Sequence, residues 1–109
     1  KMYKTPTVDD IITECKKLKK FSLYKEEDFE DFILSEIPEF GVFQATQTEL
    51  EDGDVYYKLS FDVYKIGELF LLRCLESEDL YFFSFKDMED YLLVYSGYDF
   101  SDIEFIKNT

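Results

Sequence analysis

The sequence predicts an α+β fold in which two N-terminal helices precede a four-stranded antiparallel meander sheet, one C-terminal helix and a short tail. Three observations support this. Apolar residues recur at helical spacing over residues 7–37 and alternate from residue 40 onward. Short turn signals separate the alternating runs. The 109 residues are 46% hydrophobic and 19% aromatic, which excludes the disordered class. We expect residues 1–109 to form a single compact domain, with Lys1 an expression remnant before Met2.

The first predicted helix covers residues 7–20. A threonine at position 5 or 7 can cap it, and Asp9 and Asp10 suit the positive end of its dipole. Its apolar stripe is predicted to be Val8, Ile11, Ile12, Cys15 and Leu18. The second predicted helix covers residues 25–37 and ends before Pro38. It is expected to bury Phe29, Phe32, Ile33 and Ile37.

The predicted strands are residues 40–49, 55–64, 68–76 and 80–85. The first has a Gln- and Thr-rich face that we expect to be exposed, and an acidic turn with Gly53 joins it to the second. The third is apolar on both sides, which predicts a central strand. A third helix is expected over about residues 86–96, and Gly97 ends it. The helices are expected to cover one sheet face, and residues 98–109 form either a short strand or a helical turn.

The net charge is −13, from 12 basic and 25 acidic residues. Residues 1–21 carry six Lys and three acids, so the basic charge gathers in the first helix and the rest is strongly acidic. This balance argues against direct binding of nucleic acid or an anionic membrane, and it favours a basic protein partner. A saline or crowded habitat is the alternative explanation. The abundance of Lys, Ile, Tyr, Phe, Asp and Glu is typical of a bacterial or phage AT-rich genome.

Motifs for catalysis or cofactor binding are absent from the sequence. There is no His, no glycine-rich phosphate loop and no nucleophile elbow. Cys15 and Cys74 have no metal or redox spacing, so two reduced thiols in the cytoplasm are the simplest interpretation, with a disulfide left open. There is no secretory signal and no transmembrane run. We therefore expect a cytoplasmic protein that is not an enzyme and needs no cofactor or metal.

The candidate binding surface consists of acids on the second helix and in the first hairpin turn, with one neighbouring tyrosine. These residues are Glu27, Asp28, Glu30, Asp31, Glu51, Asp52, Asp54 and Tyr56. Such a surface would steer a basic partner. Acids in a first helical turn also suit the dipole, so Glu30 and Asp31, placed beyond it, are favoured. Tyrosines are frequent in interfaces, although most sit at core edges.

The size, acidity and α+β layout resemble two groups of small inhibitors. One group is the immunity proteins that neutralise bacterial nuclease toxins. The other is the phage or plasmid DNA mimics that block restriction, CRISPR (anti-CRISPR proteins) or DNA-repair enzymes. The resemblance implies a non-catalytic inhibitor of a nucleic-acid-acting enzyme, and it assigns no individual residue. The alternative is a protein–protein adaptor that binds through a sheet edge or tyrosine-rich face and whose acidity serves only solubility.

Overall fold

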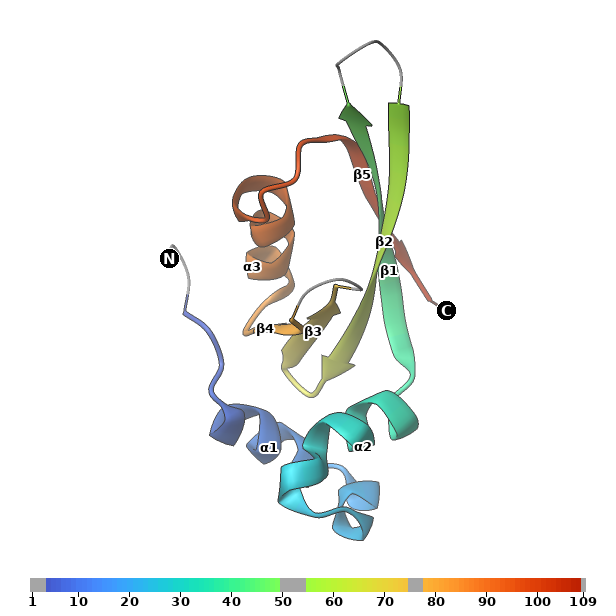
Figure 1. Cartoon of the computed structure of the whole chain (residues 1–109). Coiled ribbons are helices and arrows are strands. Elements are labelled where there is room, and N and C mark those ends of the chain that lie inside the picture. Colours follow the sequence, from blue (N-terminus) through green and yellow to red (C-terminus); the bar gives the residue numbers. More distant parts are fainter. Residues whose placement is uncertain (1–3, 50–54, 75–77, 109) are drawn as a thin grey trace.

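The computed structural model describes residues 4–49, 55–74 and 78–108, with the backbone alone described at 48–49 and 55–57. Five strands, three helices and three short helical turns make up this part of the chain (Figure 1). In order they are α1 (Val8–Lys16), η1 (Lys19–Leu23), η2 (Glu26–Asp28), α2 (Phe29–Glu36), β1 (Glu39–Glu49), β2 (Val55–Ile66), β3 (Leu69–Arg73), β4 (Leu80–Phe82), α3 (Phe85–Asp90), η3 (Tyr91–Tyr95) and β5 (Phe100–Lys107).

The sheet has the order β4-β3-β2-β1-β5, and every neighbouring pair is antiparallel. The predicted α+β class and the four-strand meander are therefore confirmed. The tail adds a fifth strand, which returns across the molecule to pair with β1. The acidic turn at residues 51–54 lies outside the described residues.

A β-bulge explains why the tail alternates imperfectly in the sequence. Thr46 lies opposite Asp102, but the next residue of β1, Gln47, lies opposite Phe100, so Ser101 is the extra residue. The Ser101 hydroxyl donates to the Thr46 carbonyl at 3.2 Å. The bulge lets Phe100 pack against the same core cluster as Ile103 and Phe105, although it is three residues from Ile103.

Helices cover both faces of the sheet, so the prediction that they share one face is wrong. On one face, Phe70 and Leu72 of β3 pack in a cluster with Met88 and Leu92 of the C-terminal helical segment. On the other face, Leu69 and Leu71 pack with residues of α1 and α2, among them Ile11, Cys15, Phe32 and Ile33. Figure 1 shows α3 beside the curved sheet and α1 and α2 beneath its β3–β4 end. β3 is buried on both sides and lies inside the sheet, between β4 and β2, so the prediction that it is not an edge strand is confirmed.

The first helix is shorter than predicted. Thr7 caps it in a capping box with Asp10, and it ends at Lys16 rather than Lys20. Leu18 then adopts an extended conformation. As a result Leu18 is 38% exposed, and Val8 at the other end is 54% exposed, so neither belongs to the core as their spacing predicted.

The third helix begins at Phe85, after the N-cap Ser84, and continues from Tyr91 to Tyr95 as a π-helical turn. Its end near residue 96 and the positive φ of Gly97 agree with the prediction. Cys15 and Cys74 are buried in different clusters on opposite sheet faces and are not bonded to each other. Within the described residues, none of the helices is long and apolar enough to cross a bilayer.

Candidate partner-binding surface

Four of the predicted site residues form one exposed group at the start of the second helix. Glu27 and Asp28 belong to η2, Glu30 and Asp31 belong to α2, and all four side chains are exposed. We call this group the acidic helix surface. Among the described residues, no ion pair or hydrogen bond involves any of these four carboxylates. Their charges are therefore available to a partner.

The surface is held in place by the aromatic packing beneath it. Phe32 and Ile33, on the opposite side of α2, are 1% and 0% exposed. The Phe32 ring meets the rings of Phe21 and Tyr24 edge-on, with centroids 4.9 and 5.2 Å away. These contacts anchor α2 to the preceding segment, and the shared core cluster with Leu69 and Leu71 of β3 anchors it to the sheet, so the acids lie on packed helical elements.

The helix start differs from the prediction, and this changes the ranking of the acids. A 3₁₀ turn occupies residues 26–28 and the α-helix begins only at Phe29, so Glu30 and Asp31 lie in its first turn. The positions of Glu30 and Asp31 therefore suit the helix dipole, just as the positions of Glu27 and Asp28 do. The reason for favouring Glu30 and Asp31 is therefore gone, and the four acids are treated as one group.

Lysines at the end of α1 and in η1 pair with the acids that flank this group. Lys16 pairs with Glu26 at 2.9 Å, and Lys20 pairs with Glu36 at 3.4 Å. Glu36 also accepts a hydrogen bond from the Tyr24 hydroxyl at 2.8 Å. That hydrogen bond lowers the pKa of Glu36 and raises the pKa of Tyr24. A count of acids along the sequence therefore overestimates the unpaired negative charge at both ends of the group.

Glu30 also influences a tyrosine on the edge strand β4. Burial raises the pKa of Tyr81, and the Glu30 carboxylate raises it further. The Tyr81 hydroxyl oxygen is buried and has no hydrogen-bond partner among the described residues. Tyr81 packs against the same core cluster as Phe29 of α2, which agrees with this influence of Glu30.

The other predicted site residues cannot be added to this surface. Glu51, Asp52 and Asp54 lie outside the described residues. Tyr56 belongs to β2 by its backbone, and its side chain is not described. Their place in a common surface stays a prediction. Three other tyrosines, Tyr64, Tyr81 and Tyr98, are half-buried at the edges of the two cores.

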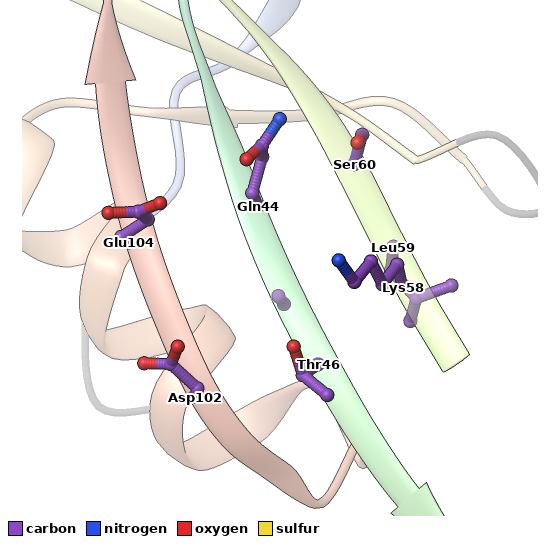
Figure 2. A pocket seen from close by; sticks show the side chains of 8 residues that line it. Gln44, Thr46, Lys58, Leu59, Ser60, Asp102 and Glu104 are labelled. Atoms are coloured by element: carbon purple, nitrogen blue, oxygen red, sulfur yellow. The ribbon is translucent and has the colours of Figure 1, made fainter. Parts of the chain in front are cut away.

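The uncovered part of the sheet forms a second polar surface that sequence reasoning missed. Figure 2 shows side chains from β5, β1 and β2 on the same sheet face around a shallow cavity of about 280 Å³. The polar lining residues are Gln44, Thr46, Lys58, Ser60, Asp102 and Glu104. The predicted exposure of the Gln/Thr face holds for Gln44, while Thr46 is half-buried. Asp102 and Glu104 were not candidates because their segment had no firm structural assignment.

This sheet surface and the acidic helix surface are formed by different elements, the first by β1, β2 and β5 and the second by η2 and α2. Comparisons with protein-family models, curated proteins and solved structures gave no significant match. A search of the described residues found no group of three or more His, Cys, Asp or Glu side chains arranged to hold a metal ion. The chemical feature that the candidate site presents is thus a group of exposed carboxylates on η2 and α2.

Proposed function

We propose that this protein is a small non-catalytic inhibitor that binds the basic nucleic-acid-binding or active-site surface of an enzyme. The observation that carries the proposal is the acidic helix surface, with four adjacent exposed carboxylates and no ionic partner among the described residues. Residues three or four apart on a helix have Cβ atoms about 5–6 Å apart, so neighbouring acids offer a cationic groove a repeating negative charge, as a phosphate backbone does. Such charges raise the association rate and exclude wrong partners.

Two kinds of inhibitor fit this surface. One is a DNA mimic of the phage type, directed against a CRISPR, restriction or DNA-repair enzyme. The other is an immunity protein directed against a nuclease toxin. In both, the partner is a basic protein in the cytoplasm, no cofactor takes part, and the chain itself binds neither nucleic acid nor an anionic membrane.

An adaptor function is the second candidate, and the uncovered sheet surface favours it. The polar side chains around the cavity in Figure 2 can form several hydrogen bonds to another protein, and the neighbouring strand β5 has one unpaired edge. In that case the acids would serve solubility alone. Neutralising the acidic helix surface would then leave binding intact.

A competition assay separates these functions. Purified restriction, CRISPR, DNA-repair and toxin nucleases are each bound to labelled DNA, and the protein is titrated in. We expect it to displace DNA from at least one enzyme. The variant Glu27→Gln/Asp28→Asn/Glu30→Gln/Asp31→Asn changes the net charge from −13 to −9. If each carboxylate contributes about 0.2–1 kcal/mol, the variant binds about 4-fold to several hundred-fold more weakly.

A matched control removes the same charge elsewhere. Its four exposed acids are Glu68, Glu78, Asp102 and Glu104, and neutralising them also gives −9. The proposal requires this control to compete nearly as well as the wild type. Equal losses in both variants would mean that only total charge matters. A loss confined to the control would favour the adaptor function.

A further inference from the structure

Three segments that are distant in the sequence line an open cavity near the first two helices. Its volume is about 400 Å³, which lies within the range of small-molecule sites in proteins. Residues 18–20 line it at the start of η1, residues 36–38 line it after α2, and residues 65 and 67 line it at the end of β2. We call it the basic cavity. It contains none of the acids of the acidic helix surface.

Part of the lining of the basic cavity is apolar. Phe32, which is only 1% exposed, and the half-buried Ile37 line it together with Pro38 and Leu18. Leu18 is exposed here because α1 ends at Lys16 and Leu18 itself is extended. An apolar chain or ring that covers these side chains leaves water, which favours binding.

Lysines outnumber acids around the basic cavity. Lys19, Lys20 and Lys65 line it with one acid, Glu36, so three positive charges and one negative give +2 on a molecule of −13. Lys20 pairs with Glu36 at 3.4 Å, whereas no carboxylate of the described residues forms an ion pair with Lys19 or Lys65. Since α1 ends at Lys16, Lys19 also lies beyond the turn in which a cation would stabilise the dipole of that helix.

The side of the cavity formed by β2 is held in place by contacts within the fold. The Lys65 ammonium lies 5.7 Å from the centroid of the Phe70 ring, a cation–π contact that leaves its positive charge unbalanced. Gly67 has a φ of +59°, and the next residue, Glu68, donates its backbone N–H to the Glu14 carboxylate at 3.0 Å. This side of the cavity is therefore formed before any ligand binds.

We propose that the basic cavity binds a small amphipathic carboxylate. The apolar body of the ligand lies against Leu18 and Ile37. Its carboxylate faces the two lysines without a carboxylate partner, Lys19 and Lys65.

The net charge of −13 does not prevent this binding, because at about 0.1 M salt exposed charges more than about 10 Å away are largely screened. A large acidic partner would instead meet repulsion over much of the surface, so a small ligand with one negative charge is the favoured occupant. The inference goes beyond the proposed function, since it concerns another surface and another class of ligand.

Octanoate is the probe, because it joins one carboxylate to a short apolar chain. Amide chemical shifts of the ¹⁵N-labelled protein are recorded during titration at constant ionic strength. Shift changes should centre on residues 18–20, 36–37 and 65–68. The control ligand 1-octanol keeps the chain without the charge and should bind about 2-fold to 30-fold more weakly. Acetate keeps the charge without the chain and should cause no shift changes in this region at the same concentrations.

Two lysine variants give a matched comparison at the same net charge of −15, two units below −13. Lys19→Gln/Lys65→Gln should weaken octanoate binding by about 2-fold to 30-fold and leave octanol binding unchanged. Lys25→Gln/Lys58→Gln removes two exposed lysines that do not line the cavity, and it should leave octanoate binding unchanged.

The apolar contact is tested with two leucine variants. Leu18→Gln should weaken the binding of both octanoate and octanol, whereas Leu23→Gln, at an 83% exposed leucine of η1, should weaken neither. Thermal unfolding checks that each variant folds, and the comparison of the three ligands on the wild type stands on its own if one does not.

Four results would overturn the proposal. They are shift changes centred outside the basic cavity, no octanoate binding, acetate binding as tight as octanoate binding, and equal octanoate affinities of wild type and Lys19→Gln/Lys65→Gln. Octanol binding as tight as octanoate binding would also contradict it, because the lysine side chains would then serve only to cover apolar surface with their stems.

Discussion

The Glu14 side chain ties the first helix to the sheet, and its removal gives a well-defined prediction. Its carboxylate accepts the backbone N–H of Glu68 at 3.0 Å and pairs with the Lys17 ammonium at 2.6 Å. The Glu14 side chain is only 12% exposed, while that of Lys17 is 61% exposed. A hydrogen bond to a charged group contributes about 1.5–3 kcal/mol, and an exposed ion pair about 0.2–1 kcal/mol. The contact with Glu68 therefore dominates.

We expect Glu14→Ala to lower the free energy of unfolding by about 1.5–3 kcal/mol, because the Glu68 N–H loses its acceptor. Glu14→Gln keeps an acceptor and should lower it by about 1 kcal/mol. Lys17→Met is the control and should lower it by less than about 1 kcal/mol. Urea unfolding at constant m-value measures each change. A loss below about 0.5 kcal/mol for Glu14→Ala would refute this account of how α1 is attached.

The contacts of Glu14 also predict that the stability of the fold depends on pH. Hydrogen bonds from Lys17 and from the Glu68 backbone lower the pKa of Glu14 below its ordinary value of 4.5. A carboxylate with a lowered pKa in the folded state stabilises the fold above the unfolded pKa and stops doing so as the pH falls through the folded pKa. The stability advantage of wild type over Glu14→Gln should therefore be constant above about pH 5.5 and shrink below pH 4.5. An advantage that stays constant down to pH 3 would contradict this.

Two further predictions concern the attachment of β5 and the first cysteine. A Cβ at Gly41 would lie 2.6 Å from the Ile106 carbonyl oxygen and would overlap the Phe105 ring. Gly41→Ala should therefore lower the free energy of unfolding by about 1–3 kcal/mol and speed amide exchange along β5, and unchanged exchange there would contradict the close packing. Cys15 is fully buried, and burial raises its pKa to about 11. Its thiol should react with a disulfide reagent only in denaturant, as peptide mass spectrometry can check, and rapid modification of the native protein would show that the site opens.

Much of the fold follows from local signals in the sequence. Thr7 and Ser84 each accept a backbone hydrogen bond at a helix start, and β1 and β2 follow their period-two patterns. The sequence of β3 also indicates that helices cover both faces of the sheet, because a strand that is apolar on both sides must be covered on both sides. The prediction of one covered face overlooked that consequence.

The remaining differences come from contacts between distant parts of the chain. The bulge at Ser101 shifts the phase of β5, and its position depends on the pairing with β1 rather than on the tail alone. The four acids of the acidic helix surface are exposed, as the sequence predicted, but the pairing of the acids that flank them was not foreseen. Glu26 and Glu36 are paired with Lys16 and Lys20, at separations of 10 and 16 residues that sequence spacing on a helix does not reveal.

The most direct test of the central claim is the salt dependence of binding to the enzyme from which the protein displaces DNA most effectively. Dissociation constants are measured by calorimetry between about 50 and 200 mM salt for three proteins. These are the wild type, the acidic-helix variant, and the control variant in which Glu68, Glu78, Asp102 and Glu104 are neutralised. We predict a steep loss of wild-type affinity with salt. The slope should be clearly shallower for Glu27→Gln/Asp28→Asn/Glu30→Gln/Asp31→Asn and nearly unchanged for the control. Equal slopes for wild type and the acidic-helix variant, or binding to none of the enzymes, would contradict the claim that these four carboxylates form the binding surface.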